Sequence, residues 1–127
     1  MVAFCHRCWT ELLSTPTVCT NCGASVDVYS RQYEKQLISL IPRSGAEKRA
    51  QICWVLGHRA KRSAVPALLE LLRDSDLFVR IAAIRALGEI GDDSAISAIE
   101  SAASGGQPAV REIARKALAM LGVHQGL

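Results

Sequence analysis

Four of the five cysteines lie within the first 22 residues, in two closely spaced pairs. Cys5 and Cys8 form one C-x2-C pair, and Cys19 and Cys22 form the other after ten intervening residues. A C-x2-C turn places two sulfurs on one side of a tight loop, and two such loops facing each other make a tetrahedral four-sulfur site that suits Zn²⁺. The spacing therefore predicts one zinc ion per chain, bound by Cys5, Cys8, Cys19 and Cys22.

Two disulfide bonds are the alternative, but they need an oxidising compartment, and the first residues show no signal-peptide layout. A set of four sulfurs leaves no coordination position open for water or substrate, so the zinc is expected to be structural. His6 lies inside a complete ligand set and is not expected to bind. The C-x2-C and C-x2-C-G spacing resembles zinc-ribbon modules, which implies a β-hairpin between the pairs. Trp9 stands where these modules usually have a small residue.

The rest of the chain repeats itself at a shift of 31 residues. KRAQICWVLGHRAKR aligns with VRIAAIRALGEIGDD, and VRIAAIRALGEIG aligns with VREIARKALAMLG. The apolar residues recur at helical spacing, and Ser63, Asp76 and Ser94 stand where helices are expected to begin. Gly57 and Gly91 are expected at or near helix ends. The predicted helices cover residues 31–41, 46–57, 64–73, 77–90, 95–104 and 108–121.

The segment ALLELLRDSDLFVRIAAIRALGEIGDDSAISAI resembles a HEAT-like repeat of the phycobilisome-lyase type. This resemblance implies a mainly α fold, a short α-solenoid of three HEAT-like helix pairs, here preceded by the small zinc ribbon. We expect the ribbon in residues 1–28 and the solenoid in 29–127, with repeats at about 33–62, 63–93 and 94–122. Iron-binding members of the family carry His-Glu pairs. This chain has none, because its histidines are followed by Arg7, Arg59 and Gln125.

The resemblance implies that the second helix of each pair lines a concave, partner-binding face. At its outward positions we expect the partner-binding residues Trp54, Ile81, Ile84, Arg85, Glu112 and Arg115. Exposed apolar side chains beside an aromatic residue and an arginine are typical of interaction hot spots. Two alternatives stay open: the zinc ribbon covers this surface within the chain, or the first repeat packs differently.

Basic residues are concentrated in one part of the chain. Residues 31–62 contain eight basic and two acidic side chains, whereas the whole chain has a net charge of only +3, which argues against bulk coating of DNA. Possible phosphate or acidic-partner contacts are Lys48, Arg49, Arg59, Lys61 and Arg62. The ordinary interpretation is a set of solvated loop charges. Arg49, Arg80 and Arg111 share one repeat position. The family resemblance implies a stacked Arg/Asp ladder between repeats there, and phosphate binding by these arginines is the alternative.

No catalytic residue is predicted. Cys53 and His58 are five residues apart on a helix, which places their side chains about 140° apart. No apolar run approaches the roughly 20 residues of a membrane-spanning helix. We expect a cytoplasmic, non-enzymatic scaffold or adaptor that binds another protein and carries a structural zinc site. Nucleic-acid binding through the ribbon and the basic first repeat is the alternative. A lesser alternative is an accessory subunit of a lyase-like or other enzyme.

Overall fold

The computed structural model describes residues 3–12 and 18–122 of the 127-residue chain. The chain forms two compact units, residues 1–43 and 44–127. Within the described part, none of the helices has the length and apolar character needed to cross a membrane. The first unit holds the paired cysteines, and the second holds most of the repeats.

The first unit contains a short two-stranded sheet and one helix. Strand β1 (Ala3–Phe4) pairs antiparallel with β2 (Glu11–Leu12), and an isolated bridge joins Val18 to Ser25. Helix α1 (Arg31–Leu40) follows, and a 3-10 turn (Ile41–Arg43) ends the unit. Part of the hairpin expected between the cysteine pairs, residues 13–17, lies outside the described residues.

A buried tyrosine joins α1 to the sheet. The Tyr33 hydroxyl accepts a hydrogen bond from the backbone N–H of Phe4 at 2.9 Å and donates one to the Phe4 carbonyl at 2.7 Å. Its side chain is fully buried, so both backbone groups find their partners away from water. Helix α1 therefore belongs to the same compact unit as the cysteines. The domain boundary expected after residue 28 stays a prediction.

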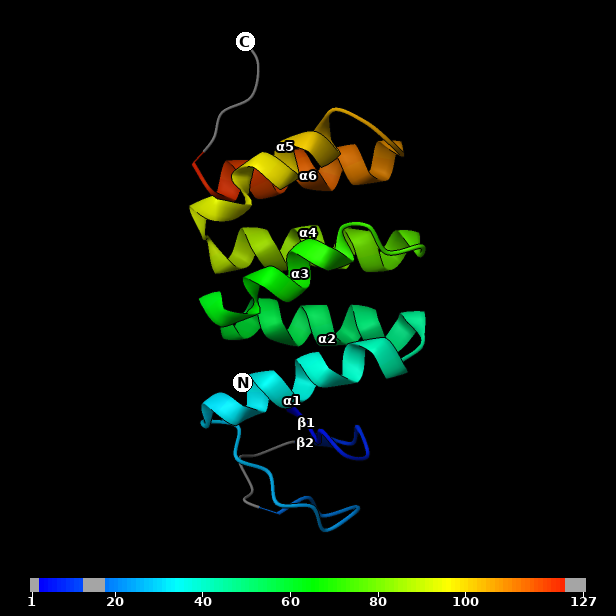
Figure 1. Cartoon of the computed structure of the whole chain (residues 1–127), viewed down its shortest axis with the longest axis vertical. Coiled ribbons are helices and arrows are strands. Elements are labelled where there is room, and N and C mark those ends of the chain that lie inside the picture. Colours follow the sequence, from blue (N-terminus) through cyan, green and yellow to red (C-terminus); the bar gives the residue numbers. More distant parts are fainter. Residues whose placement is uncertain (1–2, 13–17, 123–127) are drawn as a thin grey trace. The chain divides into compact units, whose positions relative to one another are not determined.

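The described part of the second unit, residues 44–122, contains five α-helices in two layers. These are α2 (Ala46–Arg59), α3 (Val65–Leu71), α4 (Leu77–Ile90), α5 (Ile96–Ala103) and α6 (Pro108–Met120). Helices α2, α4 and α6 lie side by side in one layer, with α3 and α5 in the other (Figure 1). The observed boundaries fall within two residues of those expected from the sequence. The predicted mainly α, solenoid-like fold is confirmed.

The helix starts differ from the prediction in one respect. The Asp76 side chain caps α4 as expected, accepting hydrogen bonds from the backbone N–H groups of Phe78 and Val79. Ser63 and Ser94 do not cap helices with their side chains, because each lies inside a 3-10 turn, Arg62–Ala64 or Asp93–Ala95. The extra turn moves the cap upstream, and in the later repeat Asp92 accepts the hydrogen bond from the Ser94 N–H.

The second helices approach one another at two equivalent glycines. A Cβ atom on Gly57 would lie 2.8 Å from the Cα of Ala86, and one on Gly88 would lie 3.0 Å from the Cα of Ala117. Gly57, predicted at or near a helix end, lies in the last turn of α2, which continues to Arg59. The glycines thus allow α2 and α4, and then α4 and α6, to pack backbone against backbone.

The predicted Arg/Asp ladder is present at its first step. The Arg49 guanidinium donates to both carboxylate oxygens of Asp74, at 2.9 and 3.0 Å, and to the Ser44 carbonyl at 2.7 Å. Arg80 and Arg111 each donate a hydrogen bond from Nη1 to a backbone carbonyl. Arg80 reaches the Asp74 carbonyl at 2.8 Å, and Arg111 reaches the Gly106 carbonyl at 3.0 Å. In the described part of the chain, Arg80 thus reaches the Asp74 carbonyl rather than the carboxylate of Asp76, four residues before it. Each arginine ties the start of a second helix to the turn before it.

The hydrogen bonds around Asp74 stabilise the ionised form of its carboxyl. Desolvation alone would raise the pKa of its carboxyl, but the hydrogen bonds from Arg49 and from the Asp76 N–H outweigh it and lower the pKa below 3.8. The same pair raises the pKa of the Arg49 guanidinium. The pair is mostly shielded from water, with 20% and 10% of the two side chains exposed.

We expect Gly57→Ala to destabilise the protein. The added methyl group must push against the Ala86 backbone, and overpacking of this kind costs about 1–3 kcal/mol. The gain in helix propensity recovers at most about 1 kcal/mol. Urea unfolding followed by circular dichroism measures the net loss. Gly105→Ala is the control, because nothing lies within 4 Å of its Cβ position. Equal stability of the two variants would contradict the close approach.

We expect Asp74→Asn to lower the melting temperature at pH 7, because it removes the only carboxylate that Arg49 contacts in the described part of the chain. The folded pKa of Asp74 lies below its unfolded value of 3.8, so the stabilisation is complete above pH 3.8. It is lost as the pH falls through the folded pKa.

The difference between wild type and Asp74→Asn should therefore shrink towards zero as the pH is lowered below 3.8 in a series of urea titrations. Comparing the two proteins at each pH cancels the effect of acid on the cysteine cluster. Asp93→Asn removes an exposed aspartate from the next turn and should leave the stability nearly unchanged. A pH-independent difference would rule out the ion pair as its source.

Candidate metal centre and helical groove

The four cysteine sulfurs of the first unit converge on one point. Their Sγ atoms all lie within 4.8 Å of one another. Cys5 and Cys22 are 3.6 Å apart, and Cys8 and Cys19 are 3.7 Å apart. Sulfurs bound at 2.3 Å in a tetrahedron are about 3.8 Å from each other, so the cluster has the dimensions of a four-sulfur metal site. The structure thus brings together the four cysteines that the spacing predicted, and they can hold a metal ion.

Two matching backbone loops position the sulfurs. In the first, the Cys5 N–H donates to Thr10 and its carbonyl accepts from the Trp9 N–H; in the second, Cys19 makes the same pair of hydrogen bonds with Ala24 and Gly23. The residue after each second cysteine has a left-handed backbone, with φ of 64° at Trp9 and 77° at Gly23. Glycine adopts this conformation without cost, whereas tryptophan does not.

The strained Trp9 is held by a neighbouring ring. Its indole stacks on the ring of Phe4, with centroids 4.7 Å apart and planes only 8° from parallel. Stacked pairs of this kind contribute about 0.5–1.5 kcal/mol beyond the area they bury, comparable to the cost of a left-handed residue. Phe4 is also the residue whose backbone bonds to Tyr33. Through Phe4, Trp9 therefore stabilises the loop that carries Cys5 and Cys8.

Hydrogen bonds to the sulfurs differ across the cluster. The Cys8 sulfur lies 3.0 Å from the Thr10 hydroxyl and 3.5 Å from the Asn21 amide nitrogen, and these contacts lower the pKa of Cys8 to about 5. For Cys22, a hydrogen bond with the Ala24 backbone lowers the pKa, but burial and the other thiols outweigh it and raise the pKa to about 11. Of these two thiols, Cys8 is therefore the more readily ionised, because it receives hydrogen bonds that stabilise a thiolate.

His6 takes no part in the cluster, as the sequence predicted. Its Nε2 atom lies 3.1 Å from the carbonyl of Ser25, which fixes the ring against the second loop. The potential ligand atoms in the described cluster are the four sulfurs alone. All four positions of a tetrahedral ion would therefore be filled by cysteine.

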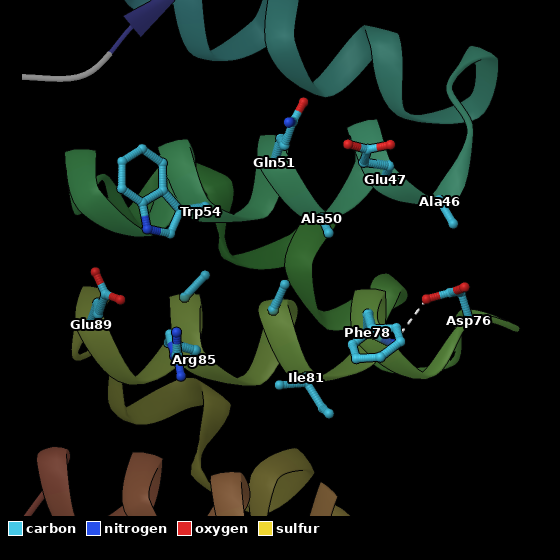
Figure 2. A pocket seen from close by; sticks show the side chains of 12 residues that line it. Ala46, Glu47, Ala50, Gln51, Trp54, Asp76, Phe78, Ile81, Arg85 and Glu89 are labelled. Atoms are coloured by element: carbon cyan, nitrogen blue, oxygen red, sulfur yellow. Dashed lines mark hydrogen bonds between the residues drawn. The ribbon is translucent and has the colours of Figure 1, made fainter. Parts of the chain in front are cut away.

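The second unit contains a groove between α2 and α4, drawn in Figure 2. Its volume is about 570 Å³. The α2 wall presents Glu47, Ala50, Gln51 and Trp54, and the α4 wall presents Phe78, Ile81, Ala82, Arg85 and Glu89. Small side chains near the middle leave the space open, and larger or charged ones stand at its two ends. The groove lies on the second helices, the face on which the sequence predicted a partner.

One end of the groove is a linked set of three side chains. The rings of Trp54 and His58 are 4.1 Å apart, and the His58 Nδ1 atom lies 2.9 Å from the Trp54 carbonyl. The same nitrogen is 3.3 Å from a Glu89 carboxylate oxygen. His58 thus links α2 to α4 while Trp54 keeps 37% of its surface exposed.

Three of the six predicted partner residues line the groove: Trp54, Ile81 and Arg85. Ile84 was predicted to face outward and is buried, with 1% of its surface exposed. It lies one helical turn before Gly88, on the face of α4 that packs against Ala117 of α6. The prediction that Ile84 is exposed is therefore wrong.

Glu112 and Arg115 are exposed on α6, outside the groove. Glu112 lies 3.6 Å from Lys116, one turn further along the same helix. Arg115 has the repeat position of Ile84, and no described helix follows α6 to cover it. The same position is therefore buried in α4 and open in α6.

The predicted basic group does not form one patch. Lys48 and Arg49 lie in the first turn of α2, and Arg59, Lys61 and Arg62 lie at its other end. Ten residues of helix, from Arg49 to Arg59, separate the two sets by about 15 Å. Arg49 is moreover held by Asp74 and the Ser44 carbonyl. Its guanidinium is therefore part of the fold rather than a free phosphate contact.

Cys53 is buried inside α2, as expected for a structural cysteine. Desolvation, with the nearby Asp74 adding to it, raises the pKa of its thiol to about 12. The thiolate that a nucleophile needs is thus disfavoured. His58, in contrast, is exposed and contacts Trp54 and Glu89, which both line the groove.

Two groove residues, Phe78 and Glu47, were not predicted from the sequence. Phe78 lines the groove with 72% of its surface exposed. The signal was available: Phe78 shares a repeat position with Glu47 and Ala109, neither of which is a core residue. When the other repeats have a charged or small residue at a position, an aromatic residue at that position is expected to be exposed to water.

A family model described as HEAT repeats matches residues 34–119 of the chain. This span covers 86 of the 127 residues, from α1 to the last turn of α6. No curated protein matches the chain. The family match thus agrees with the 31-residue period, the stacked second helices and the arginines at the start of each.

We expect the purified protein to contain one metal ion per chain and Cys19→Ser to lose it, because a hydroxyl is a poor substitute for one of four thiolates. Elemental analysis under reducing conditions measures the content and identifies the metal. Cys53→Ala is the matched control, since Cys53 lies outside the cluster. Equal metal content in wild type and Cys19→Ser would show that the cluster is not the site.

Proposed function

Because this chain belongs to the HEAT-repeat family, we propose that it is a non-enzymatic scaffold that binds another protein in the groove between α2 and α4. The observation that carries the proposal is the groove itself: an open, largely apolar channel with two exposed aromatic residues, Trp54 and Phe78, at its ends. Contiguous apolar surface of this kind is costly in water and marks a site of interaction.

The groove has the composition of an interaction hot spot. Trp54 and Arg85 belong to the residue types that contribute most to protein interfaces, and they stand on facing walls beside an alanine-lined floor. Desolvated aromatic anchors surrounded by polar rim residues give most of the binding energy in such sites. In this groove Glu47 and Gln51 form part of that polar rim.

We propose that the cysteine cluster holds a structural zinc ion. Four thiolates at tetrahedral spacing suit zinc or iron, and zinc is the redox-inert choice that adds only stability. Units of about 40 residues usually need a metal, disulfides or a partner to fold. The first unit has 43 residues, so the ion would supply much of its folding free energy.

A non-enzymatic role agrees with the chemistry of the described residues. The buried Cys53 thiol has a raised pKa, and a fully ligated metal ion has no open position for a substrate. Nucleic-acid binding, the alternative from the sequence, receives less support because its basic residues are divided between the two ends of α2. Arg49 in particular is engaged by Asp74.

We expect Trp54→Ala and Ile81→Glu to weaken partner binding at least roughly thirtyfold, since truncating a hot-spot residue costs about 2 kcal/mol or more. The measurement is quantitative affinity capture from an extract of the source organism, with mass spectrometry of the proteins retained. Both side chains are at the surface, so the helical circular-dichroism signal should stay unchanged.

Matched controls separate the groove from exposed apolar surface in general. Tyr29→Ala removes an exposed aromatic side chain from the first unit, and Met120→Glu adds a charge to the exposed face of α6. Both should leave capture intact. If the groove variants and the controls retain the same proteins in the same amounts, the groove is not the binding site.

A further inference from the structure

We propose that the groove takes an extended peptide segment with a basic residue, an apolar residue and an acidic residue at alternate positions. Read from the N-terminus, the pattern is basic-x-apolar-x-acidic for one direction of the bound peptide and acidic-x-apolar-x-basic for the other. The acidic side chain pairs with Arg85, the apolar one enters the alanine floor, and the basic one lies beside Glu47 and Phe78. This inference rests on the proposed function and names the chemistry of the partner.

The floor of the groove has room for one apolar side chain. Ala50 of α2 and Ala82 of α4 line its middle. At the same repeat positions one step further along the solenoid stand Ile81 and Ile113. The larger side chains are at positions that would fill the corresponding space between α4 and α6. The space between α2 and α4 is therefore a result of the small side chains at these positions and not a general feature of the repeat.

Arg85 supplies the positive charge. Its side chain is exposed on the rim, and within the described residues it makes no hydrogen bond or ion pair. Glu89, one turn further, already lies against His58 on the opposite wall. A cation beside an apolar floor and an indole ring is complemented by a carboxylate, and the bidentate fork of arginine suits that group.

The other end of the groove is negative. Glu47 is exposed in the first turn of α2, and Asp76 caps the start of α4. Between them the Phe78 ring stands 72% exposed. A lysine or arginine of the ligand meets both a carboxylate and an aromatic face there, and each of these attracts a cation. The proposed ligand therefore carries a basic residue at this end and an acidic residue at the Arg85 end.

The size of the groove favours an extended chain over a helix. Phe78 and Arg85 are seven residues apart on α4, about 10 Å along its axis. A helix about 10 Å across would need about 800 Å³ over that length. A single strand, about 5 Å by 10 Å in cross-section, needs about 500 Å³. The groove offers about 570 Å³ and is open to solvent on one side, so a strand fits within it, whereas a helix would stand partly outside it.

The spacing of side chains along a strand fits the groove. Residues at i, i+2 and i+4 of an extended chain share one face and are separated by about 6.6 Å each. Phe78, Ala82 and Arg85, which face the basic, apolar and acidic side chains, follow one another along α4 at intervals of about 6 and 4.5 Å. The long side chains of Arg85 and Glu47 span the small remaining difference.

A displayed library of random nine-residue peptides, selected on the zinc-loaded full chain, tests the proposal. We expect enrichment of peptides with the basic-x-apolar-x-acidic pattern. Arg85→Glu should replace the acidic preference by a basic one and lower the affinity of a wild-type peptide at least tenfold. Lys116→Glu is the matched control, because Lys116 has the repeat position of Arg85 on α6 and lies outside the groove.

Glu47→Lys tests the other end in the same way, with Glu70→Lys on α3 as its control. Enriched peptides without the charge pattern, or a pattern that Arg85→Glu leaves unchanged, would overturn the inference, as would the absence of any enriched peptide. If the peptides still depend on Trp54 and Ile81, the groove keeps its proposed function and only the partner chemistry is wrong. Peptides that bind independently of those two residues would count against both.

Discussion

The stack of second helices depends on contact between backbones. Gly57 faces Ala86, and 31 residues later Gly88 faces Ala117, each at a distance that leaves no room for a further methyl group. A contact between two backbones fixes the separation of neighbouring helices more firmly than long side chains do, because backbones have no rotamers. The repeat of this contact sets the step of the solenoid. The groove follows from it, since walls held this close enclose a channel only where the side chains between them are small.

A second constraint acts at the opposite end of the same helices. Arg49 reaches across to Asp74, so the start of α2 is tied to the turn that leads into α4. Asp74 is held in turn by the Asp76 N–H, and its carbonyl accepts from Arg80. A glycine contact near one end and a shielded ion pair near the other prevent α2 and α4 from pivoting. The groove between these fixed ends is therefore preorganised, which lowers the entropic cost of binding a ligand.

The sequence was sufficient to predict where the helices lie, but not which of their side chains neighbouring repeats bury. The 31-residue period located every helix within two residues, because helix starts and apolar spacing are local properties. The four cysteines were found for the same reason. Ile84 could not be placed, because its burial depends on the next repeat: the same position is buried in α4 and exposed as Arg115 in α6. The close approach of Gly57 to Ala86 could not be predicted, because a glycine that ends a helix and one that admits a neighbouring backbone look the same in a sequence.

The differences between repeats explain where a ligand can bind. A solenoid of identical repeats would offer the same surface at every step, and no step would be preferred. Here one repeat position holds Trp54, Arg85 and Lys116 in turn, and another holds Ala50, Ile81 and Glu112. Only at the α2–α4 step does an indole face a guanidinium across an alanine-lined floor. The periodic residues thus build the frame and hold it rigid. Under the proposed function, the residues that depart from the period would confine recognition to this one step, and the specificity of the solenoid would come from them.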